Sequence, residues 1–74
     1  MERYKFILGL EPNLDALDPE TGVKVLDLFE DAATWALLRV PADRSLVVKA
    51  CFRGICHVYE TEEEARRVWL IFGR

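Results

Sequence analysis

Two cysteines and the single histidine of this 74-residue chain stand close together, as Cys51, Cys56 and His57. Thiolate and imidazole groups are the ligands that zinc prefers. A structural zinc site takes four such ligands, however, and the chain has no other cysteine or histidine. Cys56 and His57 are also adjacent, and neighbouring residues of a strand point to opposite faces of the sheet. The sequence therefore predicts no metal site and no cofactor.

The two cysteines are nevertheless a candidate redox pair. Residues 45–60 have the pattern of two strands joined by a two-residue turn at Arg53-Gly54. In that register Cys51 faces Cys56 with Cα atoms about 4.5 Å apart, which is within disulfide range. The alternative is a pair of small side chains on a half-covered face of the sheet. The opposite and more apolar face of this expected hairpin carries Leu46, Val48, Ala50, Phe52, Ile55, His57 and Tyr59.

The sequence carries no catalytic signature. No serine or cysteine in a recognisable nucleophile turn accompanies His57. The acidic run Glu62–Glu64 is explained by helix capping, and the four glycines are too scattered to form a phosphate-binding loop. We therefore expect a protein that is not an enzyme.

The two ends of the chain give the firmest secondary-structure predictions. Residues 4–10 alternate between apolar and mixed positions, which predicts a strand. Thr61-Glu62-Glu63-Glu64 is a capping box at the start of a predicted helix. Two ion pairs at i,i+4 spacing support this helix, Glu62–Arg66 and Glu63–Arg67. Residues 68–72 are rich in strand formers, so the alternative is a terminal strand that completes a ferredoxin-like order.

The middle of the chain allows two interpretations. Apolar residues between 23 and 40 fall at helical spacing, and Pro41 follows them as a stop, so we expect a helix over residues 23–40. The alternative is a turn and a short strand over residues 18–28, because Asp18-Pro19-Glu20-Thr21-Gly22 also suits a turn.

These elements predict one small two-layer α+β domain over residues 1–74, in the order β-α-β-β-α. No run of apolar residues approaches the length of a membrane span, and no signal peptide is recognisable, so we expect a cytoplasmic protein. Charge is uneven, with −5 over residues 1–31 and +2 over residues 32–74. The positive zone is too weak to indicate a dedicated nucleic-acid-binding domain.

One segment resembles a known family. Residues 53–60, followed by residues 61–66, are similar to the third strand and second helix of the RNA-recognition motif, and residues 5–10 to its first strand. The resemblance implies binding of RNA bases by stacking on aromatic side chains. Ile55 and His57 stand where the family has aromatic residues, so we do not assign the chain to it.

The favoured function is a non-catalytic protein-interaction module, a small regulator or inhibitor that binds a protein partner or forms a homodimer. Its composition is 51% hydrophobic, which leaves apolar surface for a partner in so short a chain. The candidate contact residues are Trp35, Leu38, Trp69, Leu70 and Ile71. The alternative is RNA or DNA binding through the basic zone, whose residues are Arg39, Arg44, Lys49 and Arg53.

Overall fold

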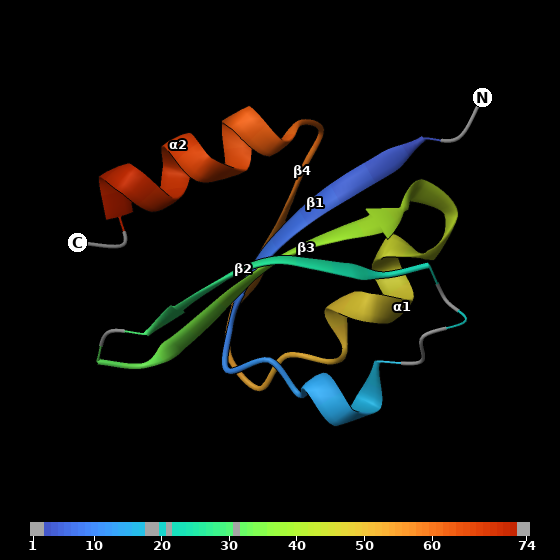
Figure 1. Cartoon of the computed structure of the whole chain (residues 1–74), viewed down its shortest axis with the longest axis horizontal. Coiled ribbons are helices and arrows are strands. Elements are labelled where there is room, and N and C mark those ends of the chain that lie inside the picture. The colour runs from blue at the N-terminus through green and yellow to red at the C-terminus, as the bar shows by residue number, and fades with distance from the viewer. Residues whose placement is uncertain (1–2, 18–19, 21, 31, 73–74) are drawn as a thin grey trace.

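The computed structural model describes residues 3–17, 20, 22–30 and 32–72. Within them the chain forms an antiparallel sheet of four strands with two α-helices (Figure 1). The elements in chain order are β1 (Tyr4–Leu10), the 3-10 turn η1 (Leu14–Ala16), β2 (Lys24–Glu30), β3 (Thr34–Pro41), the 3-10 turn η3 (Ala42–Arg44), α1 (Ser45–Lys49), β4 (Cys56–Tyr59) and α2 (Glu62–Phe72).

The strands lie in the order β2-β3-β1-β4. Strand β3 pairs antiparallel with both β1 and β2, so β1 and β2 run in the same direction with β3 between them. This is the arrangement of a split β-α-β unit, in which the crossover contains η1 in place of a full helix. Strand β4 completes the sheet on the other side of β1.

The small α+β class is confirmed, as are the first strand and the last helix. The strand matches the predicted residues 4–10, and residues 68–72 continue α2. A terminal strand over residues 68–72 is therefore wrong. The predicted β-α-β-β-α order holds only in part, because the segment expected as the first helix forms β2 and β3, and the short helix α1 stands where a strand was expected. In the described part of the chain, no helix has the length and apolar character needed to cross a membrane.

The predicted helix over residues 23–40 is wrong, because this segment is the β2–β3 hairpin. Strand β3 is central and buried on both faces, so apolar residues occupy consecutive positions and match helical spacing as well as strand spacing. In β2 a register shift between Val25 and Asp27 interrupts the alternation at Leu26. The alternative of a turn and a short strand over residues 18–28 comes closer, because β2 begins at Lys24. Residues 18, 19 and 21 of that segment lie outside the described ones.

The predicted hairpin over residues 45–60 is only half correct. Its second half is β4, but Ser45–Lys49 forms the helix α1 and crosses one face of the sheet. Burial of Val48 in this position overrides the strand preference of the valines. Residues 56–59 form the fourth strand of the chain and not the third strand that the RNA-recognition resemblance implied.

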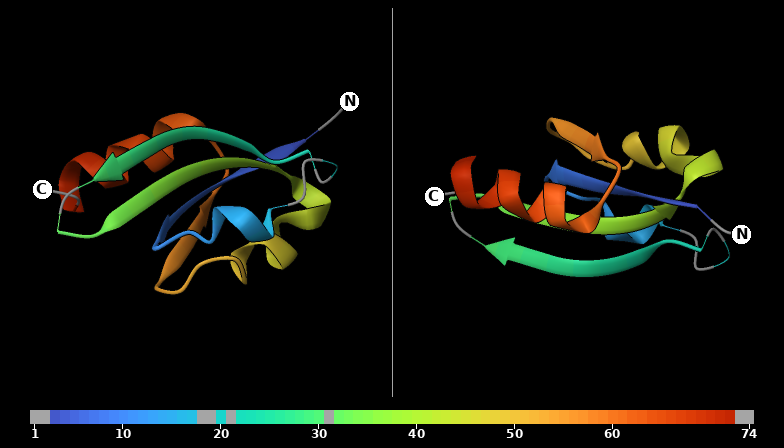
Figure 2. Two further views of the ribbon diagram at one scale, coloured as in Figure 1. Left: turned by 60° about the horizontal axis from the view of Figure 1, so that its bottom comes forward. Right: turned by 90° about the horizontal axis from the view of Figure 1, so that it is seen from above.

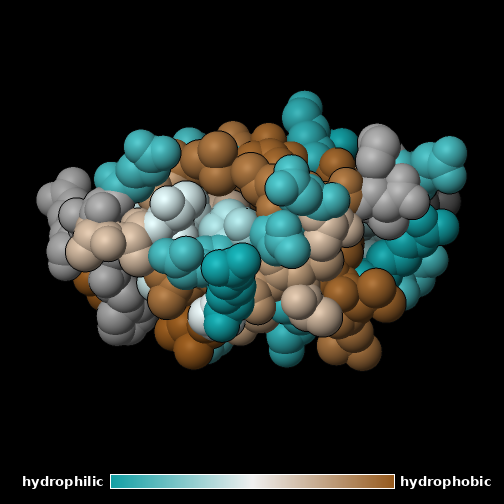
Figure 3. Space-filling view, turned by 90° about the horizontal axis from the view of Figure 1, so that it is seen from below, coloured by the Kyte–Doolittle hydropathy of each residue, from teal (hydrophilic) through white to brown (hydrophobic). Residues whose placement is uncertain are grey.

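The sheet is covered on both faces (Figure 2). On one face, Ile7, Leu38 and Val40 pack with Val48 of α1. On the other face, Leu8 and Leu37 pack with Ala65 of α2. The side on which α1 and η1 lie carries apolar and hydrophilic groups intermixed at its surface (Figure 3).

Candidate functional site

Helix α2 is fixed over the sheet by polar contacts at its start. The Oγ1 atom of Thr61 accepts a hydrogen bond from the backbone N–H of Glu64 at 3.1 Å, as the capping box predicts. Arg66 donates to Glu62 at 2.7 Å and to Asp27 of β2 at 2.9 Å. These hydrogen bonds, first to Glu62 and then to Asp27, raise the pKa of the Arg66 guanidinium. Arg66 therefore links the helix to the far edge of the sheet.

Aromatic rings fix the C-terminal half of α2. The Trp69 indole stacks on the ring of Phe29, with centroids 4.4 Å apart and 21° between the planes. It also lies against Trp35 at 5.7 Å in a tilted geometry. Because Phe29 and Trp35 are a cross-strand pair at the end of the β2–β3 hairpin, α2 is held toward that end.

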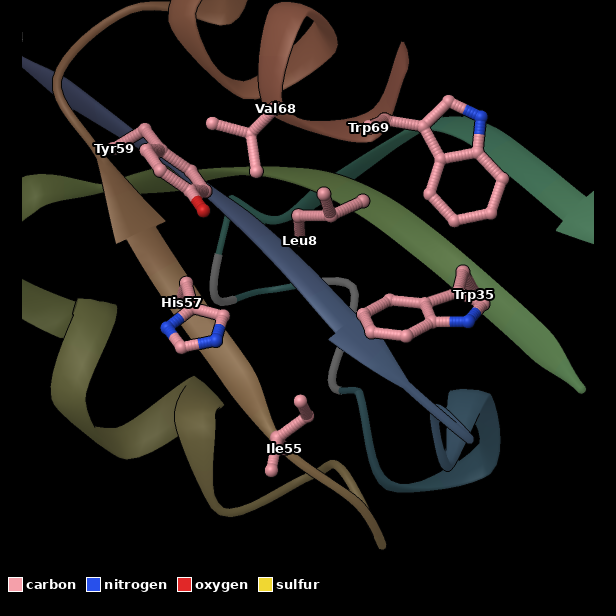
Figure 4. A pocket seen from close by; sticks show the side chains of 7 residues that line it. All are labelled: Leu8, Trp35, Ile55, His57, Tyr59, Val68 and Trp69. Carbon is pink, nitrogen blue, oxygen red and sulfur yellow. The ribbon is translucent and has the colours of Figure 1, made fainter. Parts of the chain in front are cut away.

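This position of α2 leaves part of the sheet open and creates a groove beside it (Figure 4). The groove has a volume of about 500 Å³, within the usual range for ligand sites. Strands β1 and β4 form its floor, and α2 forms one wall. We call it the α2 groove; its lining residues are Leu8, Trp35, Ile55, His57, Tyr59, Val68 and Trp69.

The lining of the α2 groove is almost entirely apolar or aromatic. None of the seven residues is an aspartate, glutamate, lysine or arginine. The side-chain polar groups are the imidazole of His57, the hydroxyl of Tyr59 and the two indole N–H groups. Burial raises the pKa of the Tyr59 hydroxyl, and the negative charge of Glu64 adds to this rise. The hydroxyl therefore stays protonated at neutral pH and can donate a hydrogen bond to an occupant.

The predicted contact residues fall into three groups. Trp35 and Trp69 line the α2 groove. Leu70 and Ile71 are 59% and 64% exposed on α2, outside the groove. Leu38 is fully buried on the opposite face of the sheet, packed among core residues, and so it is not available to a partner.

The site also contains residues that were not predicted as contacts. These are Leu8, Ile55, His57, Tyr59 and Val68. The sequence predicted Ile55, His57 and Tyr59 on one face of a strand, and all three line the groove. Their alternation was therefore a signal that could have identified them as part of one surface. The position of Leu8 beside them depends on the pairing of β1 with β4, which no local pattern reveals.

The basic residues of the alternative function do not form one surface. Arg39 lies over the ring of Tyr4, on the α2 side of the sheet, at 4.5 Å from its centroid. Arg44 donates to the carbonyl of Glu20 at 3.3 Å. Lys49 ends α1 on the opposite face, and Arg53 is exposed in the loop before β4.

The cysteines differ from the predicted pair in position. Cys51 lies in the turn after α1, where its carbonyl accepts from the backbone N–H of Asn13 at 2.7 Å, so it is not a strand residue opposite Cys56. Cys56 lies in β4, paired with Gly9, and its thiol donates to the carbonyl of Lys49 at 3.6 Å. Both are free thiols. Among the described residues, no group of three or more histidines, cysteines and acids could hold a metal ion.

The chain matches no family model, and neither a curated protein nor a solved structure shows significant similarity to it. The function must therefore be inferred from the geometry of the chain itself.

Proposed function

We propose that this chain is a non-catalytic protein-interaction module, a small regulator that binds an apolar segment of a protein partner in the α2 groove. The observation that carries the proposal is the composition of the groove, which holds both tryptophans of the chain and no acidic, lysine or arginine side chain. Tryptophan and tyrosine anchors dominate the binding energy of protein interfaces.

An exposed apolar side chain at the groove supports the same interpretation. Ile55 is 62% exposed at the end of the groove that β4 forms. Leu70 and Ile71 are further exposed apolar side chains of α2, but they lie outside the groove, and Leu70 neighbours the charged residues Glu62, Glu63, Arg66 and Arg67. Ile55 is therefore the exposed apolar side chain that adds to the contact offered by the groove.

The nucleic-acid alternative has no observation in its favour. Arg39 lies on the α2 side of the sheet and Lys49 ends α1 on the opposite side, so the four basic residues do not share one surface, and the chain has a net charge of −3. A stacking or phosphate-binding surface requires basic and aromatic groups along one path.

The experiment is selection of binders from a phage-displayed library of random peptides, followed by titration of the selected synthetic peptides. Both tryptophans line the groove, so occupation of the groove should change the intrinsic fluorescence directly. Ile55→Asp places a charge in the groove wall and should weaken the selected peptides by about tenfold or more. Leu46→Asp is the matched control, because Leu46 is 79% exposed on α1, away from the groove. Equal loss of binding in both variants, or in neither, would contradict the proposal.

A further inference from the structure

The two edges of the sheet differ in how they are protected. Strand β2 forms one edge and carries Lys24, Asp27 and Glu30, as well as a register shift. The Asp27 carboxylate also accepts a hydrogen bond from the backbone N–H of Leu28 at 3.0 Å. Charges and irregular backbone of this kind prevent edge-to-edge pairing.

Strand β4 forms the other edge and lacks these charges and this irregularity, so its short length is the one protective device that it shares with blunted edges. Its four residues, Cys56–Tyr59, include no acid, lysine or arginine, and their pairing with β1 shows no register shift. In the described ranges no further strand pairs with its outer side. An edge without charges or bulges presents its outward backbone groups as a template for another strand.

The ladder with β1 shows which backbone groups of β4 point outward. Leu10 donates its N–H to the carbonyl of Ile55 at 2.8 Å. The backbone groups of Ile55 therefore point toward β1. Along an antiparallel strand this direction alternates from one residue to the next, so His57 and Tyr59 also direct their backbone groups toward β1. The N–H and C=O groups of Cys56 and Val58 consequently point away from the sheet.

We infer that β4 is a pairing edge and that its occupant is the β4 strand of a second copy of this chain, so that two sheets join into one. With Cys56 of one copy opposite Val58 of the other, the outward groups of both residues are used. His57 then faces its own counterpart on the twofold axis. Ile55, 62% exposed, lies opposite Tyr59 of the other copy.

Charge complementarity favours a second copy as the occupant. Arg53 precedes β4 and Glu64 follows it, and neither forms an ion pair within the described residues. The other acids after β4 are already paired, Glu60 with Lys5, Glu62 with Arg66 and Glu63 with Arg67. Antiparallel pairing places the basic end of each strand beside the acidic end of the other. The ladder is short, so the apolar contact at Ile55 and this attraction add to the few hydrogen bonds that it forms.

This inference goes beyond the proposed function, because it concerns the edge of the sheet, although Ile55, His57 and Tyr59 both line the groove and face the second copy. In a continuous antiparallel sheet, paired residues point to the same face. The α2 grooves of the two copies would therefore open on one side, close to the axis, and present two binding sites to a partner.

The test is the molar mass of the full chain by sedimentation equilibrium, over about 10 to 500 µM, which spans the range expected for a short interface. The wild-type chain should approach the mass of a dimer. His57→Glu and His57→Lys each place two like charges on the axis and should weaken the dimer by about tenfold or more. An equimolar mixture of the two variants should recover a one-to-one heterodimer, which also shows that both variants fold.

The matched controls are Leu28→Glu and Leu28→Lys, which add the same charges to an exposed position on β2 and should leave the dimer unchanged. A wild-type chain that stays monomeric over this range overturns the inference. So does a dimer that the His57 variants leave intact, or a mixture that fails to recover association. Failure of the peptide selection leaves these results unaffected, so the two proposals can be separated.

Discussion

The indole of Trp69 stacks on the ring of Phe29, and this contact joins α2 to the edge strand β2 across the face of the sheet. Helix α2 has only eleven residues, so it depends on such tertiary contacts for its stability. The pair therefore holds the helix in the position that leaves the α2 groove open.

A double-mutant cycle should measure this contact. Phe29→Leu and Trp69→Leu keep apolar side chains but remove the stacking, and we expect a coupling free energy of about 0.5–1.5 kcal/mol. Urea unfolding followed by far-ultraviolet circular dichroism gives the four free energies of unfolding. A second cycle between Phe29→Leu and Leu46→Ala should be additive, because Leu46 is exposed on α1. Equal coupling in both cycles would show that the stacking contributes nothing specific.

The bridge from Arg66 to Asp27 should contribute modestly to stability. Both side chains are about 40% exposed, so we expect Asp27→Asn to lower the free energy of unfolding by about 0.5–1 kcal/mol. The loss should shrink in 1 M salt, where screening is strong. Glu63→Gln is the control, because the Glu63–Arg67 pair is more exposed and should matter less. A larger loss for Glu63→Gln would contradict this ranking of the two pairs.

Gly9 should not tolerate a side chain. A Cβ atom at this position would lie 2.3 Å from Cδ1 of Phe52, whose ring packs on the α1 face of the sheet. Gly9→Ala should therefore lower the free energy of unfolding by about 1–3 kcal/mol. Phe52→Leu in the same chain should recover part of this loss by making room, which thermal or urea unfolding can measure. If the two losses simply add, the contact between Gly9 and Phe52 is not the cause.

The thiol of Cys56 should react slowly. Burial raises its pKa, and the positive charge of Lys49 opposes the rise in part, so the thiolate is scarce at pH 8. Iodoacetamide should modify Cys56 in a Cys51→Ser chain more slowly than it modifies N-acetylcysteine. Lys49→Gln should slow the reaction further, and a faster reaction would contradict this account of the shift.

The same raised pKa has a consequence for stability. The folded state holds the thiol proton more tightly than the unfolded state does. The stabilisation is therefore complete below the ordinary thiol pKa and is lost as the pH rises through the folded one.

The sequence predicted the elements whose signals are local. The alternation of residues 4–10 and the capping box at Thr61 each specify one element without reference to the rest of the chain. The β2–β3 hairpin was missed because Ala32 and Ala33 stand in its turn, where glycine or asparagine would have marked it. Burial of β3 on both faces then removed the alternation that identifies a strand.

The candidate site was predicted only in part, for a related reason. The two tryptophans were predicted as contact residues, and both line the α2 groove. Leu38 was predicted as a contact because the expected helix over residues 23–40 leaves it off the core face, whereas in β3 it is fully buried. The groove itself arises from pairings far apart in sequence, such as that of Leu8 with His57.

The central place of β1 also bears on how fast the molecule folds. The β2–β3 hairpin is local and can close on a microsecond timescale, about 1–10 µs. One edge of β3 nevertheless remains unpaired until β1 docks against it, and β4 has no partner until β1 is in place. Because Phe6 pairs with Tyr59 across most of the chain, loop closure must precede most of the burial. We therefore expect the docking of β1 to limit the folding rate, and substitutions in β1 to slow folding more than equally destabilising substitutions in α2.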